Sequence, residues 1–220
     1  MPILGFGKQK ISIADASFSL DANWQMFEKA SDEIKFENQF NDVFSVNFFA
    51  KKPDIGASPG DENQIRRFYR NLLIQNQMAL LQCDVTPVLG VPCVILQAKL
   101  KVPNRGFLYV TTCTVPKQDF SFVFKYQAIE AGITGLRETA VMAMLPTPEI
   151  DTTNNSIVGW CVDPYDSSLE YSPMRNKADD EKYDVKFPNH PLSRSRQFMS
   201  GLLGNIEFSA NLLKSKPFSH

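Results

Sequence analysis

Three consecutive stretches decide the fold: VILQAKLKV (94–102), GFLYVTTCTV (106–115) and DFSFVFKYQA (119–128). The first and third alternate between two sets of side chains, and the second is rich in β-branched and aromatic residues, as strands are. Turn sequences, PNRG and VPKQ, separate the three. We therefore predict a three-stranded antiparallel meander, with Gln97, Lys99 and Lys101 on a solvent-facing side of its first strand.

Further strands are expected outside the meander. Phe18 and Leu20 alternate with polar residues within 11–24, and Phe44, Val46 and Phe48 share one side of 43–50. A similar run covers 79–88. These segments predict strands that pack one apolar side against a core.

Three helices complete the predicted architecture. The first follows Asp61, which has Gln64 three residues later, as a capping N-terminus requires. The second is expected over 135–145 with Thr134 as its cap, and the third begins at Pro191. On the first helix, we expect the side opposite the apolar stripe to be a solvated basic face. That face carries Arg66, Arg67, Arg70 and Asn71.

The predicted fold class is α+β, an antiparallel sheet meander flanked by helices, with a loop-rich extension and a final helix. Residues 1–148 would form the core, and residues 149–190 a polar, loop-rich excursion without sustained periodicity. Residues 191–214 would form a C-terminal helix that packs back on the core. We expect a single domain overall, since 220 residues is within the usual range.

Composition excludes several classes of function. The formal net charge is -1, and no Lys/Arg cluster is interleaved with aromatic residues, so nucleic acid is not expected as a partner. No apolar run approaches the about 18 residues of a membrane span, and we expect no export signal. The four cysteines form no CxxC pair and lie among strand-type residues, which predicts buried free thiols and a cytoplasmic location.

No catalytic residue, cofactor or metal site is predicted. His190 could pair with Ser193 or Ser195 and with Asp184 in a hydrolytic arrangement, but there is no GxSxG motif. A histidine before proline at a helix start favours a turn or capping contact instead. The acidic residues between Asp163 and Asp184 match no calcium-loop spacing, which favours a solvated surface or ion pairs with Arg175, Lys177 and Lys182. No glycine-rich phosphate loop lies between a strand and a helix.

The order of elements over 11–145 resembles the PsbP-like and DcrB-like fold, an α/β/α sandwich shared by the Mog family of Ran-binding proteins. The stretches GWCVDPYD (159–166) and RNKADDEKYDVKFPNHPLSR (175–194) also resemble a set of uncharacterised bacterial proteins with such a domain. The resemblance implies a bacterial origin and a role in binding other proteins, because relatives include photosystem subunits and chaperones of secreted effectors.

The favoured hypothesis is a non-enzymatic, cytoplasmic protein-binding module of the immunity-protein or effector-chaperone type. Its partner would be another protein, held by the excursion. The expected interaction residues are Trp160, Asp163, Tyr165, Asp166, Arg175, Tyr183 and His190. One alternative is a hydrolase or metal-dependent enzyme using His190 and the acidic segment 163–184. Another is a structural subunit of a homo-oligomer.

Overall fold

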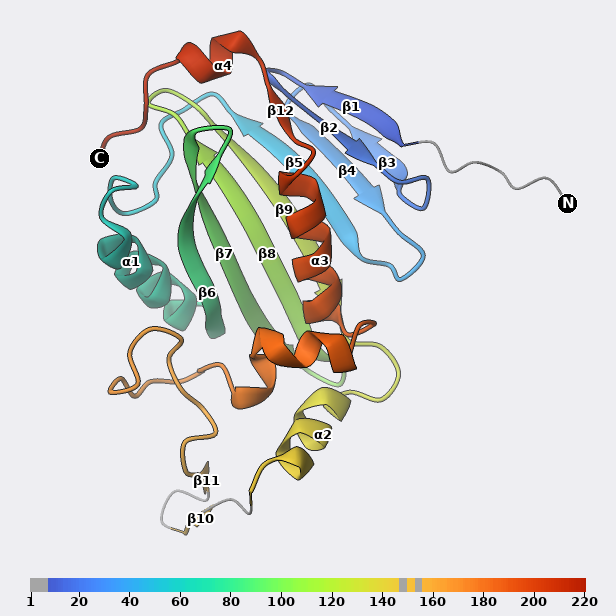
Figure 1. Ribbon diagram of the computed structural model, residues 1–220, viewed down its shortest axis with the longest axis vertical. Coiled ribbons are helices and arrows are strands. Elements are labelled where there is room, and N and C mark those ends of the chain that lie inside the picture. The colour runs from blue at the N-terminus through green and yellow to red at the C-terminus, as the bar shows by residue number, and fades with distance from the viewer. Residues whose placement is uncertain (1–7, 147–149, 153–155) are drawn as a thin grey trace, which may run out of the picture.

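A seven-stranded antiparallel sheet forms the middle of the molecule (Figure 1), in a computed structural model that describes residues 8–146, 150–152 and 156–220. Its strands, in spatial order, are β3 (Gln25–Lys29), β4 (Glu33–Glu37), β5 (Val43–Phe49), β9 (Ser121–Ile129), β8 (Gly106–Pro116), β7 (Val91–Val102) and β6 (Met78–Val88). Every neighbouring pair is antiparallel. The predicted meander is therefore confirmed as β7–β8–β9.

Smaller elements surround this sheet. Strands β1 (Gln9–Ile13), β2 (Ala16–Leu20) and β12 (Glu207–Phe208) form a second sheet, and β10 (Ile150–Asp151) pairs with β11 (Ser156–Ile157). The helices are α1 (Glu62–Gln75), α2 (Leu136–Met144), α3 (Pro191–Leu203) and α4 (Ala210–Lys214), with 3-10 turns η1 (Lys177–Asp179) and η2 (Glu181–Lys186). The segment predicted as one helix over 191–214 is thus two helices with β12 between them. No helix in the described part of the chain combines the length and hydrophobicity needed to span a bilayer.

The two faces of the large sheet carry separate cores, because side chains alternate along each strand. On one face, Ile95, Cys113 and Phe124 pack with Met199 and Leu202 of α3 and with the small sheet. The opposite face packs α1 through Ile65 and Leu73. The prediction of an antiparallel sheet flanked by helices is therefore confirmed, with α3 across β8 and β9 and α1 beside β6 (Figure 1).

Helix starts follow the sequence only in part. Asp61 caps α1 as predicted, its side chain accepting a hydrogen bond of 3.0 Å from the Gln64 N–H. The predicted Thr134 cap is wrong: α2 starts after Gly135, whose φ of 72° no ordinary side chain favours, and no side chain caps it. The left-handed conformation of Gly135 turns the chain into the helix, so the helix starts here without a capping side-chain oxygen.

The predicted solvent-facing side of the first meander strand is wrong for two of its three residues. Gln97 and Lys99 are only 2% and 3% exposed. The side-chain amide oxygen of Gln97 accepts a hydrogen bond from Arg196 Nε, and Lys99 Nζ lies 2.7 Å from Asp179 Oδ2. Alternation places these side chains correctly on one face, but it does not reveal that α3 and η1 cover that face.

The cysteine prediction is correct for three of the four thiols. Cys83, Cys93 and Cys113 are buried and free, as expected from their strand positions. Cys161 is free but exposed, because it lies in the loop before η1 rather than in a packed strand.

The first prediction concerns the aromatic core. Phe124 is fully buried and packs edge-on against Phe18, with ring centroids 6.0 Å apart. Phe124→Ala should lower the free energy of unfolding by about 3–5 kcal/mol through lost burial and an unfilled cavity. Phe27→Ala removes the same ring where it is 55% exposed, on edge strand β3, and should change it by less than about 0.5 kcal/mol. Urea unfolding of both variants measures the difference, and equal losses would contradict the described core.

Candidate binding groove

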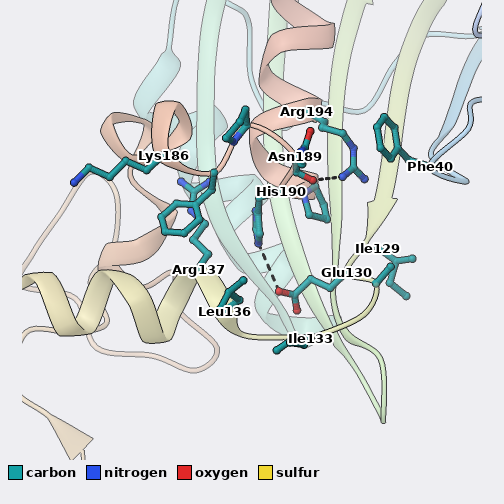
Figure 2. Close-up of a pocket in the computed structure, with 14 residues that line it drawn as sticks. Phe40, Ile129, Glu130, Ile133, Leu136, Arg137, Lys186, Asn189, His190 and Arg194 are labelled. Atoms are coloured by element: carbon teal, nitrogen blue, oxygen red, sulfur yellow. Dashed lines mark hydrogen bonds and ion pairs between the residues drawn. The ribbon is translucent and has the colours of Figure 1, made fainter.

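A groove of about 470 Å³ opens between the end of β9, the loop leading to α2, and the start of α3 (Figure 2). Its walls include Phe40 from the β4–β5 turn, Ile133 and Leu136 beside α2, and His190 and Arg194 at the start of α3. We call it the α2 groove. Residues from three separate parts of the chain meet here, so no local sequence pattern defines it.

The rim of the α2 groove is apolar and exposed. Ile133 is 80% exposed, Leu136 57% and Phe40 43%. The backbone of the turn that carries Phe40 is held by Asn38, whose side-chain oxygen accepts hydrogen bonds from the backbone N–H groups of Phe40 and Asp42. The rim therefore offers apolar surface to a ligand.

The two arginines in the wall already have partners within the chain. Arg194 donates through Nη2 and Nε to the buried carboxylate of Asp42, at 2.6 and 2.7 Å, and also to the backbone oxygen of Asn189. Arg137 is 1% exposed, and its donors reach the Ser193 hydroxyl, the Asp184 carboxylate and two backbone oxygens. These cations thus shape the groove and leave little hydrogen-bonding capacity for a ligand.

Glu130 and His190 form the polar floor. The carboxylate of Glu130 accepts hydrogen bonds from the backbone N–H groups of Phe107 and Gly135, and one oxygen lies 3.5 Å from His190 Nε2. Burial alone would raise the pKa of Glu130, but His190 and the two N–H groups outweigh it and hold the pKa below its ordinary value. Gly106 is required beside them, because a Cβ there would lie 2.2 Å from this carboxylate.

His190 also caps α3, as the capping interpretation predicts. Its Nδ1 accepts a hydrogen bond of 3.3 Å from the backbone N–H of Leu192, so Nδ1 carries the lone pair and Nε2 the proton in the neutral ring. The imidazole is thereby oriented toward Glu130.

The tautomer of His190 affects whether this cluster could bind a metal ion. Ligand atoms of Glu130, Glu138 and His190 lie within 4.8 Å of one another, a spacing that an ion could bridge. A ligating histidine normally donates its other ring N–H, whereas here the other nitrogen accepts. Lys99 Nζ is also only 4.0 Å from Glu138 and competes for that carboxylate. The donor set therefore suits an ion-paired cluster better than a cation site.

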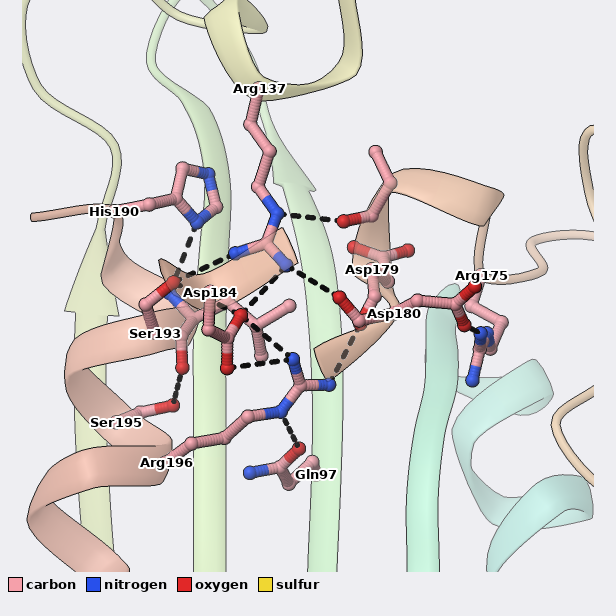
Figure 3. A network of polar contacts seen from close by, with 12 residues as sticks. Gln97, Arg137, Arg175, Asp179, Asp180, Asp184, His190, Ser193, Ser195 and Arg196 are labelled. Atoms are coloured by element: carbon pink, nitrogen blue, oxygen red, sulfur yellow. Dashed lines mark hydrogen bonds and ion pairs between the residues drawn. The ribbon is translucent and has the colours of Figure 1, made fainter. Parts of the chain in front are cut away.

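The hydrolytic arrangement considered for His190 is not assembled (Figure 3). The Ser193 hydroxyl donates to Asp184 at 3.0 Å, and the Ser195 hydroxyl donates to the backbone oxygen of Leu192 at 2.8 Å. Both serines are buried, and neither is hydrogen-bonded to His190. The carboxylate beside His190 is Glu130, not Asp184.

A network of ion pairs holds η1 and η2 over the sheet (Figure 3). Asp184 accepts from both Arg137 and Arg196, while Asp179 pairs with Lys99. Asn176 and Asp179 form a capping box at the start of η1. The network fixes the wall that carries Arg137, and with it one side of the α2 groove.

Asp163 and Tyr165, both predicted interaction residues, anchor the excursion to α1 and β6. Asp163 is 4% exposed and accepts from Arg70 Nε and Nη2, at 2.7 and 2.9 Å. The Tyr165 hydroxyl donates to Asp84, and the Arg66 guanidinium lies 3.9 Å from the centre of its ring. The expected solvated basic face is therefore wrong for Arg66 and Arg70, because the excursion covers them.

The other predicted interaction residues are divided between packing and solvent. Trp160 and Tyr183 pack around Val141 of α2, and Arg175 pairs with Asp180. Asp166 is exposed and accepts hydrogen bonds from Ser168. Of the seven residues, only His190 lines the α2 groove.

Sequence reasoning missed Phe40, Glu130, Ile133 and Leu136. One signal was present: in AGITG (131–135) a lone isoleucine lies between two glycines, outside any apolar periodicity. The structure gives both glycines positive φ, 71° at Gly132 and 72° at Gly135. An apolar side chain in such a tight, polar-type turn indicates a surface role rather than a core position.

Comparison with known proteins gives the fold. No protein-family model matches the chain, and no curated protein matches it in sequence. Among solved structures, the Ran-binding protein Mog1p of Saccharomyces cerevisiae superposes with a TM-score of 0.51 at 8% identity, covering 94% of this chain and 99% of Mog1p. The chain has the α+β fold of Mog1p.

Other structures are similar at a lower level. PsbP (CyanoP) of Synechocystis shares 13% identity over 66% of this chain and 91% of its own length, with a TM-score of 0.39. LpqN of Mycobacterium tuberculosis, involved in cell envelope biogenesis, shares 13% over 64% and 85%, with a TM-score of 0.33. The resemblance of the 159–166 and 175–194 stretches to bacterial proteins stays a prediction.

The second prediction separates Asp163 from Asp166. Asp163→Asn removes the negative charge of a buried carboxylate that accepts two hydrogen bonds from Arg70. It should lower the free energy of unfolding by about 3 kcal/mol. Asp166→Asn alters an exposed residue of the same loop and should have a much smaller effect. Urea unfolding monitored by circular dichroism tests this, and similar losses in both variants would contradict the anchoring role of Asp163.

The third prediction concerns pH. Burial raises the pKa of Asp163, but hydrogen bonds from Arg70, Tyr171 and the Tyr165 N–H outweigh it, so the folded-state pKa is below the ordinary 3.8. The stability from this carboxylate is therefore fully present above pH 3.8 and is lost as the pH falls from there through the lower folded value. Wild type should lose more stability than Asp163→Asn across that window in urea unfolding. Parallel pH profiles would show that Asp163 has no depressed pKa.

Proposed function

We propose that the chain is a non-enzymatic protein-binding module, and that the α2 groove receives a large apolar side chain of its partner. The observation that carries the proposal is the exposed rim of Phe40, Ile133 and Leu136 around a groove whose arginines are bonded within the chain. Such a groove supplies shape and apolar area rather than reactive groups. That combination suits an anchor residue of a protein interface.

Hydrophobic burial supplies the driving force. Ile133 and Leu136 make little use of their apolar surface within the chain, since they are 80% and 57% exposed. Covering side chains of this size stabilises a complex by about 1.5–3 kcal/mol each before binding costs are subtracted. Asn38 holds the backbone of the turn that carries Phe40, so this turn does not have to be ordered on binding.

The enzyme alternative has less support. General acid–base or nucleophilic catalysis needs a group that can reach a substrate atom. In the α2 groove, His190 is committed to the α3 cap and Glu130, and both candidate serines are buried elsewhere in hydrogen bonds. The imidazole and the two hydroxyls that a hydrolytic reaction would need are thus engaged in hydrogen bonds and ion pairs that position the wall.

We further propose an immunity-protein or effector-chaperone role in the cytoplasm. The four free cysteines support a reducing compartment. The fold is also used by Mog1p, whose name describes it as Ran-binding, so a protein partner is compatible with this architecture. The proposed contact surface is the α2 groove, whereas the sequence analysis expected the excursion to hold the partner.

The fourth prediction uses a random peptide library, displayed in segments of about ten residues, with the purified full chain as bait. Selection should enrich peptides with a large apolar residue. The selected peptides are then synthesised, and their binding to variants of the chain is measured. Ile133→Asp and Leu136→Asp should each weaken binding at least about tenfold, because about 1.4 kcal/mol or more of free energy from apolar burial is lost. Fluorescence anisotropy measures the dissociation constants.

Val185→Asp is the matched control. Val185 is 83% exposed, like Ile133, but does not line the α2 groove, so this variant should bind as wild type does. Equal weakening by all three substitutions, or no enrichment of apolar peptides, would overturn the proposal. If sedimentation shows self-association that Ile133→Asp abolishes, the homo-oligomer alternative would replace it.

A further inference from the structure

A second pocket, of about 430 Å³, continues from the α2 groove along α3. It is lined by the end of β2, Trp24 and Tyr126, and by α3 residues that include Gln197 and Gly201. We call it the α3 pocket. Both are lined by Phe40 and Arg194, whose guanidinium lies 4.6 Å from the centre of the Phe40 ring. These two residues therefore lie where the two sites meet, and we call them the Phe40–Arg194 ridge.

One side of α3 lines both sites. The lining positions on the helix recur at helical spacing: Pro191, Arg194, Gln197, Phe198 and Gly201, and Asn205 follows after the helix ends. From Pro191 to Leu203 the helix extends about 18 Å, at about 1.5 Å per residue. An extended chain of about six residues has that length.

Gly201 is the residue on this side that internal packing does not explain. It lies within α3, where glycine is less favourable than alanine by about 0.5–1 kcal/mol. A Cβ built at Gly201 would have no heavy atom within 4 Å, so the chain itself does not require glycine there. A missing side chain on a groove wall leaves room for a second backbone to approach closely.

The polar groups nearby suit a peptide backbone. Within the described residues, the side-chain amides of Asn23 and Gln197 have no hydrogen-bond partner, and both residues are exposed beside the α3 pocket. A primary amide both donates and accepts, so it can bond to the N–H and C=O groups of an extended segment. By contrast, Asn205 is already bonded to the Ser19 N–H and the Gly201 carbonyl.

We propose that the α2 groove and the α3 pocket form one continuous site for about six residues of a partner protein in extended conformation. The apolar anchor occupies the α2 groove, the chain crosses the Phe40–Arg194 ridge, and its backbone passes over Gly201 within reach of Gln197. The inference rests on the proposed function for its anchor and adds the conformation of the bound segment and its path along α3.

The fifth prediction tests this with the synthetic peptides selected above. Gly201→Ala should weaken binding about tenfold, since its methyl group occupies the space of the peptide backbone, yet leave the melting temperature unchanged or raised by about 2 °C. Gln197→Ala should weaken binding about fivefold. Ser200→Ala is the control: it creates the same side chain one position away, outside both sites, and should bind as wild type does.

A spectroscopic measurement locates the peptide independently. The chain has two tryptophans, so Trp160→Phe leaves Trp24, in the α3 pocket, as the sole reporter. Peptide binding should then shift the Trp24 emission. If Gly201→Ala binds like Ser200→Ala and Trp24 does not respond, the continuous site is wrong. The proposed function still holds in that case provided Ile133→Asp weakens binding, whereas a peptide insensitive to every variant overturns both.

Discussion

The buried carboxylate of Asp42 is the constraint on which the groove depends. Asp42 is fully buried, and a charge in that position must be paired to be tolerated. Its partners come from two other elements: Arg194 of α3, in a two-point contact, and the hydroxyl of Tyr126 on β9. Burial and this carboxylate raise the pKa of Tyr126, so the hydroxyl stays a donor. One residue thereby sets the distance between α3, the sheet and the turn that presents Phe40.

Ion pairs place the rest of the wall in the same way. In its described residues the excursion has only short strands and 3-10 turns. Three of its carboxylates, those of Asp163, Asp179 and Asp184, are bound by cations on the helices and the sheet: Arg70 on α1, Lys99 on β7, Arg137 on α2 and Arg196 on α3. Buried ion pairs contribute more to specifying one arrangement than to net stability in some proteins. Here the hydrogen-bond donors of Arg137 and Arg194 in the groove wall are bonded to carboxylates of the chain, so the rim exposes mainly apolar surface. The same ion pairs that position the wall therefore also leave the groove apolar.

The difference between local effects and contacts across the chain explains what the sequence could predict. Strand alternation around Phe124, the Asp61 cap and the His190 cap are local effects, and each is found in the structure. The burial of Gln97 and Lys99 and the pairing of Arg66 and Arg70 depend on segments about 80 to 100 residues away in the chain, which periodicity does not report. The rim residues Phe40 and Leu136 share a surface only because β5 and β9 are neighbours, an outcome of topology. Sequence therefore predicted the sheet and its flanking helices, but not which side chains those helices and the excursion cover.

Two positions of the finished structure break local rules without an internal benefit. Ile133 is 80% exposed in a turn between two left-handed glycines, and Gly201 weakens α3 although a methyl group would fit. In a chain selected only to fold, each would be replaced readily, since a polar residue at the first position and alanine at the second are at least as stable. Departures of this kind concentrate at functional surfaces. They lie on opposite sides of the Phe40–Arg194 ridge, Ile133 in the lining of the α2 groove and Gly201 in the lining of the α3 pocket, which is the arrangement that one bound segment spanning both would require.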